Sequence, residues 1–67
     1  MKFTERFNEV LHITNKTQAE IARALHLCKQ TVSDYKRGKA VPSLQMLCAL
    51  CDYLDVSADY LLGRTEY

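Results

Sequence analysis

Apolar side chains recur every three to four positions at the start of the chain, which is the spacing of one face of an α-helix. The positions that fit this face are Phe3, Phe7, Val10 and Leu11. The pattern predicts a helix over residues 3–13, followed by a break at Asn15-Lys16.

The segment Thr17-Gln-Ala-Glu20 predicts the start of a second helix. The Thr17 hydroxyl can accept from the Glu20 amide while the Glu20 carboxylate reaches back to the Thr17 amide, which is a capping box. The inward face of this helix would carry Ile21, Ala22 and Leu25. We expect the helix to end near His26.

A third helix is predicted from Lys29 to Arg37, where only Val32 and Tyr35 are apolar. Gly38 ends it, because glycine adopts the left-handed backbone conformation at a helix C-terminus without steric cost. Tyr35 can either pack in the core or stack on a sugar-phosphate backbone. Cys28 stands where an N-cap Ser or Thr is favoured, so we expect a weak cap there.

Pro42-Ser43 opens a fourth helix, with Ser43 as its N-cap. The helical spacing predicts a core face made of Leu44, Leu47, Cys48, Cys51 and Leu54. Ser57 is expected to cap a last helix over residues 58–62, which Gly63 ends. The sequence therefore predicts an all-α protein of five helices in a single domain over residues 1–67.

Composition agrees with a globular domain, since 48% of the residues are hydrophobic and only two are Gly. No apolar run approaches the ~20 residues of a membrane span, and no signal peptide follows Met1. We therefore expect a cytoplasmic protein without a membrane segment.

Charge is unevenly distributed, although the net charge is only +1. Residues 29–39 carry four basic side chains against Asp34, whereas residues 40–67 carry Arg64 against four acidic side chains. One basic segment in a small domain can present a polarised surface to a polyanion.

The predicted third helix is polar over most of its surface, which is typical of a helix that faces a polar partner. Its outward side chains are Lys29, Gln30, Ser33, Asp34, Lys36 and Arg37. Lys can donate to guanine, Gln can pair with adenine, and Asp can accept from the cytosine amino group. About three residues separate this helix from the preceding one, which is the spacing of a helix-turn-helix.

The segment from Gln18 to Gly38, QAEIARALHLCKQTVSDYKRG, resembles the Cro/CI (XRE-type) family of phage repressors and bacterial regulators. Pro42-Ser43-Leu44 and the closing segment 54–63 continue the resemblance, which covers roughly residues 5–63. It implies a compact five-helix, lambda-repressor-like domain with the helix-turn-helix in helices two and three. It also implies sequence-specific DNA binding and transcriptional repression, with no cofactor and no enzymatic activity.

The resemblance also implies roles for particular residues. Gln18 matches a position that hydrogen-bonds a phosphate, and Lys29, Gln30 and Asp34 match positions that reach bases. Thr31, Arg37 and Lys39 match neighbours that contact the DNA backbone. The predicted DNA-binding set is Gln18, Lys29, Gln30, Thr31, Ser33, Asp34, Lys36, Arg37 and Lys39.

Two departures from the family pattern stand out. His26 occupies a turn position where the family often has Gly, and a positive φ there has a cost for His. Leu11 and Lys36 occupy positions where the family often has an Arg–Glu ion pair. An apolar contact can replace such a pair without loss of stability.

Cys48-x-x-Cys51 could be half of a zinc site or a redox pair, but zinc needs four ligands and the redox motif needs a βαβ context. We expect both cysteines to be core residues, and we expect no metal. The two His residues and the lack of a nucleophile–base set give no support to catalysis.

We expect the partner to be a double-stranded DNA operator bound by a homodimer. The predicted dimer face comprises Leu50, Tyr53, Tyr60 and Leu61, although extra core contacts explain these residues equally well. The alternative function is a helix-turn-helix module that binds protein, or the antitoxin-like half of a protein pair. The residues that favour the DNA-binding interpretation are Lys29, Gln30, Lys36, Arg37 and Lys39, whereas the low net charge and Asp34 favour the alternative.

Overall fold

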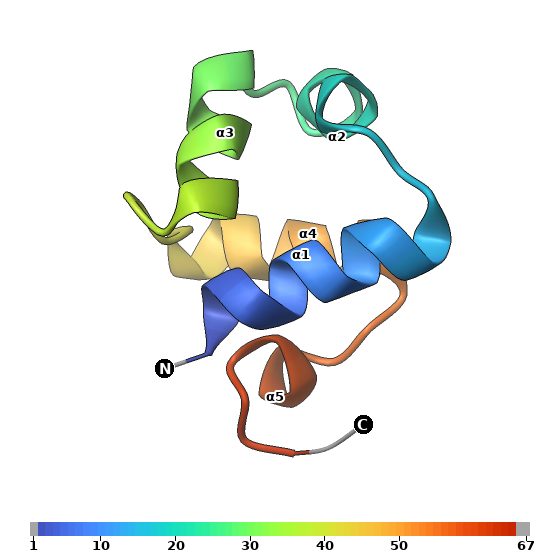
Figure 1. The fold of residues 1–67 in the computed structure, drawn as a ribbon, viewed down its shortest axis with the longest axis vertical. Coiled ribbons are helices and arrows are strands. Elements are labelled where there is room, and N and C mark those ends of the chain that lie inside the picture. The colour runs from blue at the N-terminus through green and yellow to red at the C-terminus, as the bar shows by residue number, and fades with distance from the viewer. Residues whose placement is uncertain (1, 66–67) are drawn as a thin grey trace.

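The computed structural model describes residues 2–65, which form five helices and no strand (Figure 1). These helices are α1 (Phe3–Thr14), α2 (Gln18–Ala24), α3 (Lys29–Arg37), α4 (Leu44–Leu54) and α5 (Ala58–Leu61). The all-α prediction is confirmed, and each predicted helix is present within a residue or two of its expected bounds.

Polar caps start three of the helices as the sequence predicts. The Glu20 amide donates to Thr17 Oγ1 and the Thr17 amide donates to Glu20 Oε1, each at 3.1 Å, so the capping box is complete. Ser43 and Ser57 each accept from the amide three residues ahead. Cys28 is the N-cap residue of α3, as predicted, but its thiol makes no capping hydrogen bond.

Several turns use the left-handed backbone conformation next to a helix end, and two of them bear on the helix-turn-helix. Gly38 has φ of 77° immediately after α3, where its lack of a Cβ removes the steric cost. His26 has φ of 56° in the turn between α2 and α3. The predicted positive φ of His26 is therefore confirmed.

An aromatic cluster fixes α1 against α3. The rings of Phe3 and Phe7 stack with centroids 5.2 Å apart, and Tyr35 meets them edge-on at 5.9 and 6.1 Å. Such edge-to-face pairs each add about 0.5–1.5 kcal/mol beyond the burial of area. Tyr35 is buried, so its side chain belongs to the core and is not available to stack on DNA.

The core face of α4 differs from the prediction. Leu47, Leu50 and Leu54 are buried, whereas Leu44 is 83% exposed and Cys48 is exposed. The apolar run over residues 46–51 contains more than one stripe at helical spacing, so periodicity alone cannot select the buried stripe. Cys51 is half-buried and packs against the core, so only this cysteine of the pair fits the expected role.

The arrangement leaves α2 and α3 at one end of the molecule, with α1 and α4 across the middle and α5 at the opposite end (Figure 1). In this view α2 is seen end-on while α3 lies in the plane, so the two helices cross steeply. The first described residue lies close to the end of α5, since the Lys2 amide donates to the Leu62 carbonyl at 3.5 Å. No helix within residues 2–65 is both long and apolar enough to cross a membrane.

Candidate nucleic-acid interface

Buried side chains hold α2 and α3 together as one unit. Ile21 and Ala22 of α2 and Val32 of α3 are all buried in the same core cluster. The Leu27 amide donates to the Ala22 carbonyl at 2.8 Å and closes the turn between the helices. This packing leaves the rest of α3 free to present polar side chains.

A side-chain hydrogen bond joins the first residues of the two helices. Gln18 Nε2 donates to the Lys29 carbonyl oxygen at 3.0 Å. An amide side chain has two N–H groups and an acceptor oxygen, so Gln18 keeps further hydrogen-bonding capacity. Its predicted phosphate contact is therefore compatible with this bond.

All nine predicted DNA-binding residues lie on the α2–α3 unit or in the turn that follows it. The exposed members are Lys29, Gln30, Arg37 and Lys39. The half-buried members are Gln18, Thr31, Ser33, Asp34 and Lys36. The structure thus brings the predicted set onto one continuous segment, with Val32 and Tyr35 turned into the core.

Three of these side chains form a hydrogen-bonded network along α3. Gln30 Nε2 donates to Asp34 Oδ1 at 2.9 Å, and an Arg37 guanidinium nitrogen lies 3.4 Å from the same oxygen. The spacing of these residues along the helix is compatible with such contacts, but the sequence did not show that two donors share one oxygen. Asp34 is therefore paired with a cation and does not stand as an isolated carboxylate.

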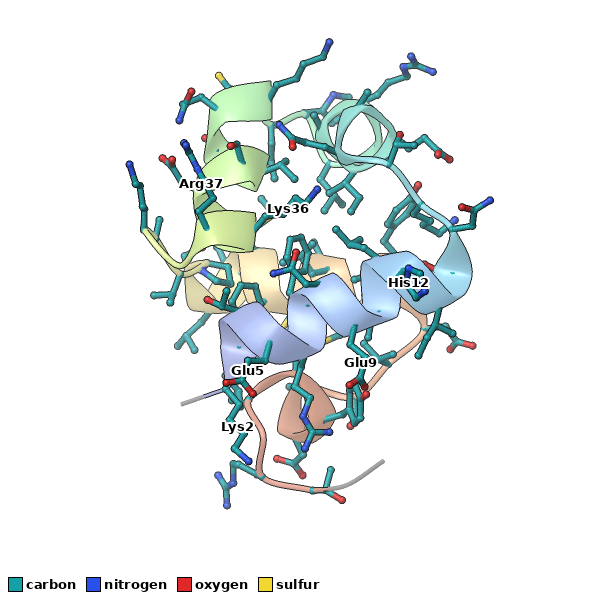
Figure 2. All side chains as sticks on the ribbon, viewed as in Figure 1. Lys2, Glu5, Glu9, His12, Lys36 and Arg37 are labelled. Atoms are coloured by element: carbon teal, nitrogen blue, oxygen red, sulfur yellow. The ribbon has the colours of Figure 1, made fainter. Side chains whose placement is uncertain are left out.

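Lys36 and Arg37 leave α3 in different directions (Figure 2). Arg37 lies on the outer side of the helix, whereas Lys36 extends toward the side where α1 and α2 lie. Because Lys36 is also half-buried, Arg37 is the better placed of the two to meet a large polyanion.

Only part of the predicted dimer face is exposed to solvent. Leu50 and Leu61 have no exposed surface, since both pack in the core, and the prediction that they meet a second copy does not fit this structure. Tyr53 and Tyr60 are half-buried. Burial of the two leucines instead supports the alternative of extra core contacts.

Both tyrosines already have partners on α1 or just after it. Lys16 Nζ lies 4.9 Å from the ring centre of Tyr53, and the Arg6 guanidinium lies 4.6 Å from that of Tyr60. The Tyr60 hydroxyl donates to Glu9, which points from α1 toward α5 (Figure 2). This hydrogen bond, together with desolvation, raises the pKa of Tyr60 despite the opposing effect of Arg6.

Other apolar side chains are the ones left exposed. Ile13 is 70% exposed and borders an apolar groove of about 660 Å³ between the end of α1 and the α4–α5 turn. Val41 and Leu44 are 57% and 83% exposed and lie just beyond α3. The exposure of Val41 was not predicted, and the prediction that Leu44 lies in the core is wrong. Within the described part of the chain, no group of three or more His, Cys, Asp or Glu could hold a metal ion.

The steep crossing of α2 and α3, the short turn and the polar outer surface of α3 define a helix-turn-helix domain. The helix-turn-helix family model matches residues 14–61, so the chain belongs to that family. The predicted resemblance to phage and bacterial regulators of the Cro/CI (XRE) type is confirmed by this match and by the relatives.

The relatives include a repressor, an activator and other transcriptional regulators. The chain is 33% identical over 64 residues to the cryptic phage CTXphi transcriptional repressor RstR of Vibrio cholerae, covering 96% of this chain and 57% of that protein. It is 33% identical over 66 residues to the transcriptional regulator ImmR of Bacillus subtilis, covering 98% of this chain and 52% of that protein.

A third relative is the transcriptional activator BcrR of Enterococcus faecalis, which is 27% identical over 66 residues, covering 98% of this chain and 32% of that protein. The chain thus spans little more than half the length of the first two proteins and a third of the last. No solved structure gives a significant match.

Proposed function

We propose that this chain is a sequence-specific DNA-binding domain that regulates transcription as a repressor, with α3 lying in the major groove. The observation that carries the proposal is the division of α3 into two sides. Val32 and Tyr35 are buried, whereas Lys29, Gln30 and Arg37 face outward. Membership of the helix-turn-helix family and the similarity to RstR, which is described as a repressor, support it.

The N-terminal residues of the second helix in this motif meet base edges, and the first helix crosses the phosphate backbone. In this arrangement Lys29 and Gln30 contact bases, because both are exposed in the first turn of α3. Gln18, Arg37 and Lys39 contact phosphates on either side. The domain acts in the cytoplasm, where it binds DNA and has no catalytic role.

Two copies are needed for a full operator. Successive major-groove segments on one side of DNA lie roughly 34 Å apart, and the longest extent of the chain's Cα trace is 28 Å. A single copy is therefore too small to occupy two half-sites. We propose a homodimer that pairs through the exposed apolar residues Val41, in the connection that follows the DNA-facing helix, and Leu44, the first residue of α4.

Binding-site selection from random duplexes, followed by fluorescence-anisotropy titration at two salt concentrations, tests the proposal. The expected result is one enriched motif, bound at least about a thousandfold more tightly than random DNA. Absence of any enriched motif, with weak binding to every duplex, would refute it. That result would favour the alternative, a helix-turn-helix module that binds another protein.

A further inference from the structure

Asp34 accepts two contacts through a single oxygen on the exposed side of α3. Gln30 Nε2 donates to Oδ1 at 2.9 Å from one turn before, and Arg37 approaches the same oxygen at 3.4 Å from one turn after. The Asp34 and Arg37 side chains are 30% and 52% exposed, so the network sits at the surface that the proposed function assigns to DNA.

The first consequence concerns the orientation of Gln30. A free glutamine amide can present its oxygen or its nitrogen to a base, because the terminal torsion is broad and roughly two-fold. The bond to Asp34 uses one N–H and directs the nitrogen toward the C-terminal end of α3. Pairing with adenine needs one N–H donor and the amide oxygen, and both remain available.

The second consequence concerns Arg37. A guanidinium held near a carboxylate has part of its charge offset, so it gains less from a neighbouring phosphate. The carboxylate is itself repelled by phosphates, and in the groove this repulsion is compensated by a basic neighbour such as Arg37 or by an amino group on a base edge. Asp34 therefore weakens binding to random DNA more than binding to a matching site.

We infer that Asp34 determines specificity by acting through its neighbours: it orients the Gln30 amide for adenine and restrains Arg37 from indiscriminate phosphate contact. This inference rests on the proposed function, because it assigns a role within the same DNA-binding surface. Asp34 is a positioning residue in this scheme.

Two substitutions separate its two effects. Asp34→Asn keeps an oxygen that can accept from Gln30 but removes the charge that holds Arg37. Asp34→Ala removes both. Asp59→Asn is the matched control, because Asp59 has the same charge and an Arg64 partner 3.9 Å away but lies on α5, at the opposite end of the molecule from α3.

Each variant is titrated against the selected site, the site with its adenine pair replaced, and random DNA, after circular dichroism has confirmed its fold. We expect Asp34→Asn to bind random DNA more tightly, with a logarithmic salt slope steeper by about 0.9, since Arg37 is released to make on random DNA the phosphate contact that it makes at the preferred site. Its preference for the adenine pair is retained. Asp34→Ala also binds random DNA more tightly, and its preference for the adenine pair falls about tenfold.

A double-mutant comparison excludes a purely structural role. If Asp34 acts on that base pair through Gln30, Gln30→Ala and the Gln30→Ala, Asp34→Ala double variant show the same residual preference. Retention of the full adenine preference by Asp34→Ala would overturn the orienting role. Equal changes in random-DNA binding for Asp34→Asn and Asp59→Asn would overturn the restraint of Arg37. In both cases wild-type specificity would remain, whereas a wild type without any preferred site would refute the proposed function itself.

Discussion

The side-chain amide of Asn8 on α1 donates to the backbone carbonyl of Lys36 in the last turn of α3, with 2.9 Å between nitrogen and oxygen. The last four carbonyls of a helix lack partners within that helix. Asn8 supplies a partner for one of them, and the same nitrogen donates to the Thr4 carbonyl at 3.0 Å. This bond docks α1 on α3 where the family pattern has an ion pair at the positions of Leu11 and Lys36.

Loss of this bond should weaken the whole domain. We expect Asn8→Ala to reduce the free energy of unfolding by about 1 kcal/mol, because a half-buried carbonyl loses its donor. For a domain of this size, that corresponds to a melting temperature lower by about 4–8 °C. Gln45→Ala removes an exposed amide on α4 and serves as the control. Equal melting temperatures for the two variants would contradict the docking role of Asn8.

The positive φ of His26 predicts a stabilising substitution. We expect His26→Gly to be more stable than His26→Ala by about 0.5–1 kcal/mol, because alanine keeps the steric cost of the left-handed conformation and glycine does not. Thermal unfolding of both variants measures the difference. Because neither variant has an imidazole, its contribution does not enter the comparison. Identical stabilities of His26→Gly and His26→Ala would mean that the turn relaxes to a negative φ in the alanine variant.

Lys39 lies just beyond α3 and is exposed, as a phosphate contact requires. Lys39→Ala should weaken binding to selected and random DNA by the same factor and make the logarithmic salt slope shallower by about 0.9. Arg64→Ala, which removes a charge beside Asp59 of α5, at the opposite end of the molecule from α3, should leave the slope unchanged. A changed base preference with an unchanged slope would instead make Lys39 a base contact.

The proposed dimer predicts a different effect at Leu44 than at Ile13. Both side chains are exposed, so a glutamate at either position should leave the fold intact. Leu44→Glu should lower affinity for a palindromic site without changing affinity for a single half-site, and Ile13→Glu should change neither. The reverse pattern would move the interface to the groove beside Ile13, and sedimentation velocity on the complexes would report the stoichiometry.

The three thiols should react at different rates. Burial, and then the nearby Cys48 and Asp52, raise the pKa of Cys51, so less thiolate is present at a given pH. We expect alkylation followed by mass spectrometry to modify the exposed Cys28 and Cys48 before Cys51 at neutral pH. The Cys51 rate should rise at higher pH as its thiolate forms. Fastest labelling at Cys51 would be incompatible with its burial.

Local signals in the sequence were sufficient for most of the fold. The Thr17–Glu20 capping box, the Ser43 and Ser57 caps and Gly38 each act within one helical turn, so their effect depends little on the rest of the chain. The α2–α3 unit and its polar outer side could be predicted for the same reason.

Contacts between distant segments could not be predicted. In α4 the apolar residues nearly surround the helix, so only packing decides that Leu50 is buried and Leu44 exposed. The bond from Asn8 to Lys36 joins residues 28 positions apart and leaves no local pattern. The shared oxygen in the Asp34 network depends on side-chain rotamers, which the residue spacing permits but does not determine.

The contact between Lys2 and Leu62 joins the first helix to the last one, so we expect it to bear on how the chain folds during synthesis. The first helix to be made, α1, has its packing partners in α3 and α5, and a helix of its 12 residues is only marginally stable alone in water. Until the segment that ends at residue 62 has left the ribosome, Phe3 and Phe7 lack part of the core that later covers them. We therefore expect the N-terminal helix to become protected only after translation has passed α5, in a single late step.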